Sequence, residues 1–134
     1  MYRFGTTYKK MTFKDLGLSP EVLRAISEIG FETPSEIQEK SIPVLLETER
    51  DYVGLAQTGT GKTAAFGLPM IEQTDPSFRA IQSLILCPTR ELCLQIAKEL
   101  ESYSKYAEGV NVVAVYGGAL SLIHISEPTR QKPI

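Results

Sequence analysis

The sequence predicts an α/β fold in which a parallel β-sheet is flanked by helices. Three observations support this fold class. Short apolar runs typical of buried strands alternate with longer segments of helical periodicity. A glycine-rich segment, AQTGTGKT at Ala56–Thr63, stands between one such run and one such helix. The 134 residues, 43% of them apolar, are enough for one modest domain with a core of its own.

The first helix is expected directly after Ser19, which is a good N-cap followed by a proline that suits the first helical position. Gly30 is expected to end this helix. Its apolar side is formed by Val22, Leu23, Ile26 and Ile29. A second helix is expected after Ser35, where Pro43 introduces a kink or a restart. Its apolar residues are Ile37, Ile42, Val44, Leu45 and Leu46.

The remaining elements alternate in type. Residues 52–55 form a short strand that leads into the glycine-rich loop, and residues 62–73 continue as a helix. The pattern then repeats, with a buried strand at 80–88, a helix at 90–107 and another strand at 111–118. One side of the later helix is expected in the core: Leu92, Ile96, Leu100 and Tyr103.

Composition excludes several classes of protein. The net charge of -2 gives no bulk signal for a nucleic-acid partner. Cys87 and Cys93 do not form a CxxC pair, which argues against a disulfide framework or a zinc site, and Cys87 is expected to be inert packing. No stretch approaches the ~18 apolar residues of a membrane span, and the start lacks the apolar segment of a signal peptide. We therefore expect a cytoplasmic protein with no membrane partner.

The segment AQTGTGKT matches the phosphate-loop pattern GxxxxGK[ST], with Ala56 in place of the first glycine. Gly59 and Gly61 let the backbone approach phosphate oxygens closely, and backbone amides at the start of the following helix attract the anion. Lys62 adds a charge toward the β- and γ-phosphates, and the Thr63 hydroxyl is suited to ligate Mg²⁺ on the same nucleotide. The loop alone leaves the base and the reaction open.

Four segments together resemble the DEAD-box RNA helicases. GFETPSEIQ at Gly30–Gln38, with Phe13 upstream, is similar to their Q motif, which places a Q motif region at 11–39. AQTGTGKT is similar to motif I, and PTREL at Pro88–Leu92 is similar to motif Ia. Gly117 and Gly118 are similar to the GG element. The resemblance covers residues 11–119 and implies an incomplete RecA-like P-loop NTPase domain.

This resemblance implies ATP and Mg²⁺ as cofactors. The Gln38 amide would pair with the adenine edge, and Phe13 would pack on the adenine ring. Without the resemblance, Gln38 would be interpreted as an exposed helix residue and Phe13 as a core anchor. The phosphates would be held by Gln57, Thr58, Gly59, Thr60, Gly61, Lys62 and Thr63.

The resemblance also implies a surface that binds the RNA sugar-phosphate backbone without reading its sequence. Arg90 could instead be an ordinary charged residue in the first turn of a helix, but the residue four positions on is Leu94, which cannot pair with it. The residues implied in RNA binding are Pro88, Thr89, Arg90, Gly117 and Gly118.

The sequence departs from the family where the reaction is carried out. The acidic DEAD tetrapeptide, the SAT triad and a second RecA-like domain are not present, and no Asp is followed directly by Glu. We therefore assign no catalytic residue. We expect this chain alone to bind ATP and hardly turn it over.

Both ends of the chain differ from the middle. Residues 1–10 are interpreted as an extension, with Met11 as a possible true start. Residues 120–134 are interpreted as a non-native tail, because Leu120–Arg130 resembles a translated sequencing adapter; the alternative is a strand followed by a proline-marked loop. His124, which lies in this tail, carries no functional weight on this interpretation.

Other classes of function remain open from the sequence. The chain could be a small P-loop nucleotide-binding module or switch without helicase activity. A GTPase is disfavoured, because no NKxD signature is present. The chain could also be a nonfunctional translated fragment. Since the phosphate-loop strand would lack neighbours, we expect marginal stability and aggregation.

Overall fold

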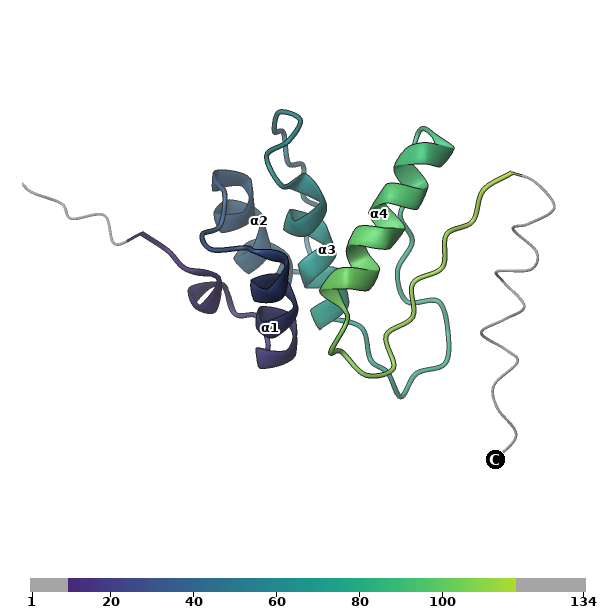
Figure 1. The fold of residues 1–134 in the computed structure, drawn as a ribbon, viewed down its shortest axis with the longest axis horizontal. Helices are drawn as coiled ribbons and strands as arrows, with labels where there is room; N and C mark the ends of the chain where they lie inside the picture. Colours follow the sequence, from purple (N-terminus) through teal and green to yellow (C-terminus); the bar gives the residue numbers. More distant parts are fainter. Residues whose placement is uncertain (1–9, 118–134) are drawn as a thin grey trace, which may run out of the picture.

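The computed structural model describes residues 10–117, and every regular element in that range is helical (Figure 1). The predicted extension falls almost wholly outside these residues, and the predicted tail at 120–134, including His124, lies outside them entirely. A short 3-10 helix and four α-helices follow one another: η1 (Phe13–Leu16), α1 (Pro20–Ile29), α2 (Glu36–Glu47), α3 (Lys62–Glu72) and α4 (Arg90–Tyr103).

The helix ends follow from the local residues. The Ser19 hydroxyl accepts a hydrogen bond from the Val22 N–H at 3.4 Å, so the predicted N-cap of α1 is confirmed. Gly30 ends the same helix with a φ of 97°, a conformation that favours glycine. Helix α2 continues through Pro43, so of the predicted kink or restart the restart is excluded, and the kink stays a prediction. Helix α4 is shorter than predicted and ends at Tyr103.

The helices pack around one hydrophobic core. Helix α3 lies between α2 and α4 and contacts both, while α1 contacts α4 (Figure 1). The approach of α3 to α4 depends on Gly67, because a Cβ there would lie 2.4 Å from the Leu100 Cδ2. The predicted stripe of α4 is confirmed, with three residues buried and Leu92 packed against the core. The large buried members of the core are Phe13, Leu16, Leu18, Val22, Ile26, Ile42, Leu68, Ile71, Ile96, Leu100 and Tyr103.

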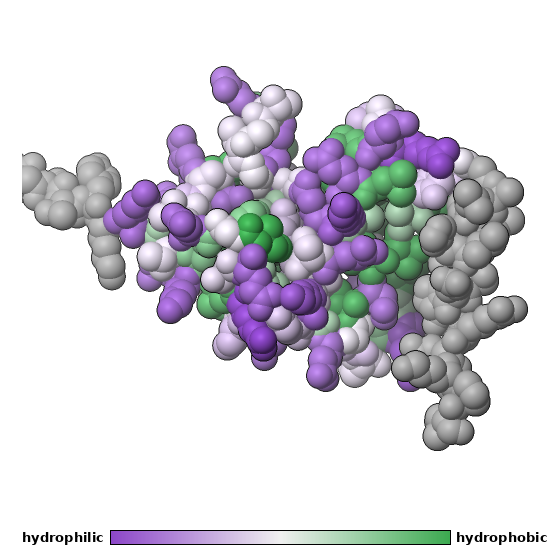
Figure 2. Space-filling model, in the orientation of Figure 1, coloured by the Kyte–Doolittle hydropathy of each residue, from purple (hydrophilic) through white to green (hydrophobic). Residues whose placement is uncertain are grey.

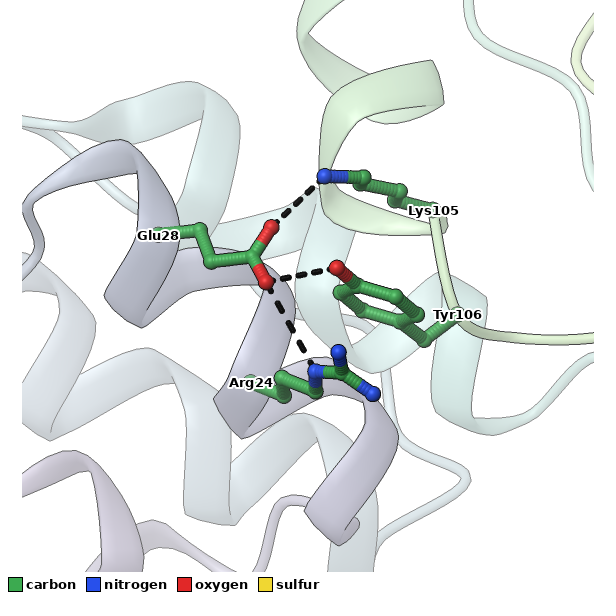
Figure 3. A network of polar contacts seen from close by, with 4 residues as sticks. All are labelled: Arg24, Glu28, Lys105 and Tyr106. Atoms are coloured by element: carbon green, nitrogen blue, oxygen red, sulfur yellow. Dashed lines mark hydrogen bonds and ion pairs between the residues drawn. The ribbon is translucent and has the colours of Figure 1, made fainter.

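Polar contacts connect α1 to distant parts of the chain. The backbone N–H and the hydroxyl of Ser19 both donate hydrogen bonds to Glu72 Oε1 at the end of α3, and both donor–acceptor distances are 2.8 Å. Figure 3 shows a second connection, in which the Glu28 carboxylate accepts from Lys105 Nζ at 2.6 Å and from the Tyr106 hydroxyl at 2.5 Å. Arg24 Nε lies 3.6 Å from the same carboxylate. The Ser19 bonds thus hold the start of α1 against the end of α3, and the Glu28 contacts hold α1 against the segment that follows α4.

No strand is present within residues 10–117, so the structure does not confirm the predicted sheet. The segments predicted as strands nevertheless keep a strand-like alternation. Ile85 and Cys87 are half-buried against the core, whereas Leu84 and Leu86 are 77% and 86% exposed. Parallel strands need hydrogen-bonding neighbours and cover on both faces, and here one face packs on helices while the other is open.

Two extended segments, residues 80–88 and 111–117, run beside α4. Apolar side chains gather between α4 and these segments, on the face of the molecule that Figure 2 shows. The large apolar side chains with the greatest exposure belong to segments predicted as strands: Val53, Leu55, Ile81, Leu84 and Leu86. In the part of the chain that is described, no helix is long and apolar enough to cross a membrane.

Candidate nucleotide and RNA sites

Gln38 connects α2 to the phosphate loop. Its side-chain Nε2 donates to the backbone carbonyl of Gly61 at 3.1 Å, and its Oε1 accepts from the backbone N–H of Ser35 at 2.9 Å. The side chain is only 4% exposed, so the interpretation of Gln38 as an exposed helix residue is wrong. The Ser35 hydroxyl, which lies close to Gly61, is buried and has no hydrogen-bond partner among the described residues.

A second contact connects the same helix to the chain that enters the loop. The Ser41 hydroxyl donates to the Tyr52 hydroxyl at 2.9 Å, and Ser41 is almost fully buried. Helix α2 therefore contacts the chain just before the phosphate loop, at Tyr52, and the loop itself, at Gly61. This arrangement fixes the loop without any strand hydrogen bonds.

The loop has the backbone conformation that its glycines permit. Gly59 and Gly61 have φ angles of 77° and 80°, in the region that disfavours residues with a Cβ. Next to Gly59 the space is open, whereas a Cβ on Gly61 would lie 2.3 Å from the Gln38 Nε2. The Thr60 hydroxyl donates to the Gln57 carbonyl at 2.6 Å, which closes the turn.

Helix α3 begins directly after the loop, and its N-cap is Gly61, which has no side chain to cap the first turn. The first backbone N–H groups of α3 are therefore available to an anion, and the helix dipole favours one there. Lys62 is exposed at the start of this helix, and Thr63 is half-buried. Gln57 and Thr58 are exposed on the loop.

Phe13 lies in the core. It is 6% exposed, and its ring stacks on Phe31 with a centroid separation of 5.7 Å. Phe31 in turn contacts Tyr103 of α4 at 5.8 Å. The structure thus places Phe13 as the core anchor that was the alternative interpretation, while Gln38 lies at the loop.

The residues predicted to bind RNA lie at the start of α4 and at the end of the last extended segment. Thr89 is the N-cap of α4, and its hydroxyl oxygen accepts from the Leu92 N–H at 3.2 Å. Pro88, Thr89 and Arg90 are exposed, as is Gly117. Gly118 lies outside the described residues.

Sequence reasoning missed Tyr116. The Arg90 guanidinium carbon lies 4.5 Å from the centroid of the Tyr116 ring, which connects the start of α4 to the last extended segment. The signal that could have found this residue is its place directly before the glycine pair. The two predicted groups of RNA-binding residues are thus connected by an aromatic ring.

A cavity of about 590 Å³ lies between α3, α4 and the extended segments. Both cysteines line it, and the Cys93 thiol lies 3.8 Å from the Val115 carbonyl. Burial, with a smaller effect of the neighbouring Cys93, raises the pKa of the Cys87 thiol above its ordinary value. Within residues 10–117 no group of three His, Cys, Asp or Glu could hold a metal ion.

The chain contains a phosphate-loop motif at the start of α3, the motif typical of P-loop nucleotide-binding proteins, and comparison with known families agrees with the resemblance to helicases. The model of the DEAD/DEAH box helicase family matches residues 35–131, and the chain belongs to this family. The ATP-dependent RNA helicase DeaD of Haemophilus influenzae is 53% identical over 109 residues, which are 81% of this chain and 18% of that protein. The DeaD helicase of Escherichia coli K12 is 53% identical over 107 residues, or 80% of this chain and 17% of that protein.

Solved structures show the same relationship. A DEAD box protein from Methanococcus jannaschii is similar with a TM-score of 0.80 and 42% identity, over 87% of this chain and 31% of that one. The yeast Dbp5 bound to RNA and ADP BeF3 is similar with a TM-score of 0.69 and 40% identity, over 71% of this chain and 25% of that one. These similarities support a RecA-like α/β fold. The chain spans less than a fifth of the length of the two DeaD relatives.

Proposed function

We propose that this chain carries the ATP-binding part of the first RecA-like domain of an ATP-dependent RNA helicase that remodels short RNA duplexes. The hydrogen bond from Gln38 to Gly61 carries the proposal. It joins the residue expected to select adenine to the loop expected to hold the phosphates. In the complete domain, the segments at 52–55, 80–88 and 111–118 would form strands of a parallel sheet.

The nucleotide would be bound at the start of α3. The residues fit a polyphosphate, because Gly59 borders open space and the first turn of α3 has no side-chain cap. Lys62 would hold the β- and γ-phosphates, with Gln57, Thr58 and Thr60 around them, and the Thr63 hydroxyl would ligate Mg²⁺. When bound, Mg²⁺ neutralises charge on the phosphate oxygens.

Adenine would be recognised by Gln38, whose two hydrogen bonds within the protein would rearrange to free the amide for the base edge. Phe13 would support this side of the site from the core, through its stacking on Phe31. Packing on the adenine ring would require Phe13 to leave that position.

RNA would be held through its sugar-phosphate backbone by Pro88, Thr89, Arg90, Gly117 and Gly118. Thr89, Arg90 and Gly117 are exposed and present the donors that suit phosphates: a hydroxyl, a guanidinium and a backbone amide. Contacts to phosphates carry no base information, so the binding would not depend on sequence.

Turnover would require groups that this sequence does not contain. The family's acidic tetrapeptide is absent from the 134 residues, so we propose that this chain alone binds ATP without hydrolysing it. Its partner in catalysis would be a second RecA-like domain. A cytoplasmic location remains the prediction from the sequence.

Titration of the 134-residue chain with a fluorescent ATP analogue and Mg²⁺ tests the proposal. We expect Lys62→Ala to weaken binding by roughly 10- to 100-fold, because a charge-assisted contact is lost. We expect Gln38→Ala to reduce the preference for ATP over GTP in competition, while the matched variant Gln95→Ala, on the exposed side of α4, changes neither affinity nor preference. Equal affinity of the original chain for ATP and GTP would contradict the role of Gln38.

A further inference from the structure

Arg90 is oriented by an aromatic ring and not by a carboxylate. Its guanidinium lies 4.5 Å from the Tyr116 ring centroid, and within residues 10–117 no ion pair joins Arg90 to an acidic side chain. Arg90 is exposed as the first residue of α4, whereas Tyr116 is half-buried and lines the cavity beside that helix. The ring is thus the more fixed member of the pair.

The type of partner determines what the guanidinium can still do. A carboxylate would neutralise Arg90 and occupy two of its five N–H donors. The face of an aromatic ring attracts the cation without accepting those hydrogen bonds in the guanidinium plane. Contact with a ring therefore restricts a long, flexible side chain and leaves its charge and its donors free.

We propose that Tyr116 is a positioning residue that holds the Arg90 guanidinium ready for a phosphate of the RNA backbone. The inference rests on the proposed RNA-binding function. Tyr116 directly precedes Gly117, so the same contact fixes the spacing between the two groups of residues proposed to bind RNA. It would act through Arg90, and RNA need not touch the tyrosine.

The molecule contains a second arginine over a tyrosine, which serves as a matched control. The Arg24 guanidinium carbon lies 4.0 Å from the Tyr106 ring centroid. In this pair, however, Glu28 also forms an ion pair with Arg24 and accepts a hydrogen bond from the Tyr106 hydroxyl (Figure 3). The charge of Arg24 is thus already paired within the protein. This second contact stabilises the packing of α1, and its ring has no free cation to present.

The experiment uses the full 134-residue chain and a fluorescently labelled oligouridylate as the RNA probe. The variants are Tyr116→Leu, Tyr116→Phe, Arg90→Ala, the double variant Arg90→Ala with Tyr116→Leu, and the control Tyr106→Leu. RNA affinity is measured at several salt concentrations. The NMR chemical shift of the Arg90 Nε–H, which the ring current of a nearby aromatic ring displaces, shows whether the guanidinium still lies against the ring. If Tyr116→Leu lacks a cooperative thermal transition, Tyr116→Thr, which also favours extended backbone, replaces it.

We expect Tyr116→Leu to weaken RNA binding roughly two- to fivefold, the factor that an exposed cation–π contact supplies. Tyr116→Phe restores affinity and keeps the ring-current shift of the Arg90 signal. In the Arg90→Ala background, Tyr116→Leu causes no further loss. Tyr106→Leu leaves RNA affinity unchanged, although it lowers the melting temperature.

Three results would overturn the inference, and they differ in what they mean for the proposed function. If Arg90→Ala weakens binding but Tyr116→Leu does not, or if the two losses add in the double variant, the positioning role is wrong and the RNA-binding function stands. If Arg90→Ala binds RNA as tightly as the original chain, the proposed RNA contact of Arg90 fails, and the role of Tyr116 falls with it.

Discussion

Gly61 has two separate reasons to be glycine. Its φ of 80° disfavours any residue with a Cβ, and a Cβ there would meet the buried Gln38 amide at 2.3 Å. We expect Gly61→Ala to destabilise the chain by more than the roughly 1–2 kcal/mol of a left-handed residue and to weaken binding of an ATP analogue. Thermal unfolding and nucleotide titration measure the two effects.

Gly59→Ala is the control for this prediction. Gly59 has a similar φ of 77°, but its Cβ would meet nothing within 4 Å. It should therefore show the backbone cost alone. Equal destabilisation by the two substitutions would mean that contact with Gln38 does not constrain the loop.

The Cys87 thiol offers a test of the packing beside α4. Because burial raises its pKa above the ordinary value of 9.0, the thiolate is scarce at neutral pH. We expect alkylation of Cys87 by iodoacetamide to be slow at pH 7, and its rate to keep rising with pH beyond 9.0, where an ordinary thiol would begin to level off. The measurement uses a Cys93→Ser variant, and unfolding in denaturant should restore ordinary reactivity. Fast alkylation at neutral pH in the folded state would contradict the half-buried position.

At this scale, the resemblance placed Gln38 with the phosphate loop, and Gln38 does lie beside Gly61, while its role in nucleotide binding stays a prediction. The packing of Phe13 depends on Phe31, a contact between two elements that periodicity does not reveal. Tyr116 was missed for the same reason, since its partner Arg90 lies in another element.

At the scale of elements, Glu28 joins α1 to the chain after α4. Hydrogen bonds from Lys105, and then from Tyr106, lower the pKa of the Glu28 carboxyl below its ordinary value of 4.5. A lowered folded-state pKa contributes stability above pH 4.5, and this contribution disappears as the pH falls through the folded value. We expect Glu28→Gln to lower the melting temperature at pH 6 to 7, and this effect to shrink progressively as the pH falls below 4.5.

Glu36→Gln provides the comparison for Glu28→Gln. Glu36 also has a lowered pKa, but its partner Lys40 lies one turn away in the same helix. Losing that contact releases no distant segment, so the change in melting temperature should be smaller. Equal effects of the two substitutions would show that the Glu28 contacts do not connect α1 to the later chain.

The predicted helices are present because their signals are local, namely the cap at Ser19, the glycine at the end of α1, and apolar periodicity. The predicted strands lack this kind of support. A strand is completed by hydrogen bonds to chain that is distant in sequence, and the alternation at residues 84–87 specifies a face without specifying a neighbour. The sequence could therefore predict the strand pattern, while the sheet itself remains a prediction.

At the scale of the whole molecule, the open apolar face should govern behaviour in solution. Leu84 and Leu86 are 77% and 86% exposed, and side chains of this kind on extended segments favour association between chains. We expect the 134-residue chain to self-associate with rising concentration, as measured by sedimentation velocity. We also expect that it shows no cooperative unfolding transition at temperatures above about 50 °C.

Replacing both Leu84 and Leu86 by lysine should reduce this association and change the melting temperature little, because neither side chain is in the core. The matched variant Ile85→Lys places the charge on the half-buried side of the same segment and should unfold the chain. Unchanged association of the double lysine variant would show that another surface is responsible.

The contacts of Glu28 also set an order of events during synthesis. Its partners Lys105 and Tyr106 follow it by 77 and 78 positions, so they leave the ribosome long after α1 has emerged. Until then α1 lacks α4 as well, and its apolar side has no complete surface to pack against. In a nascent chain, α1 therefore becomes fully protected only after α4 and the residues that follow it have emerged, and until then it is open to chaperones and proteases.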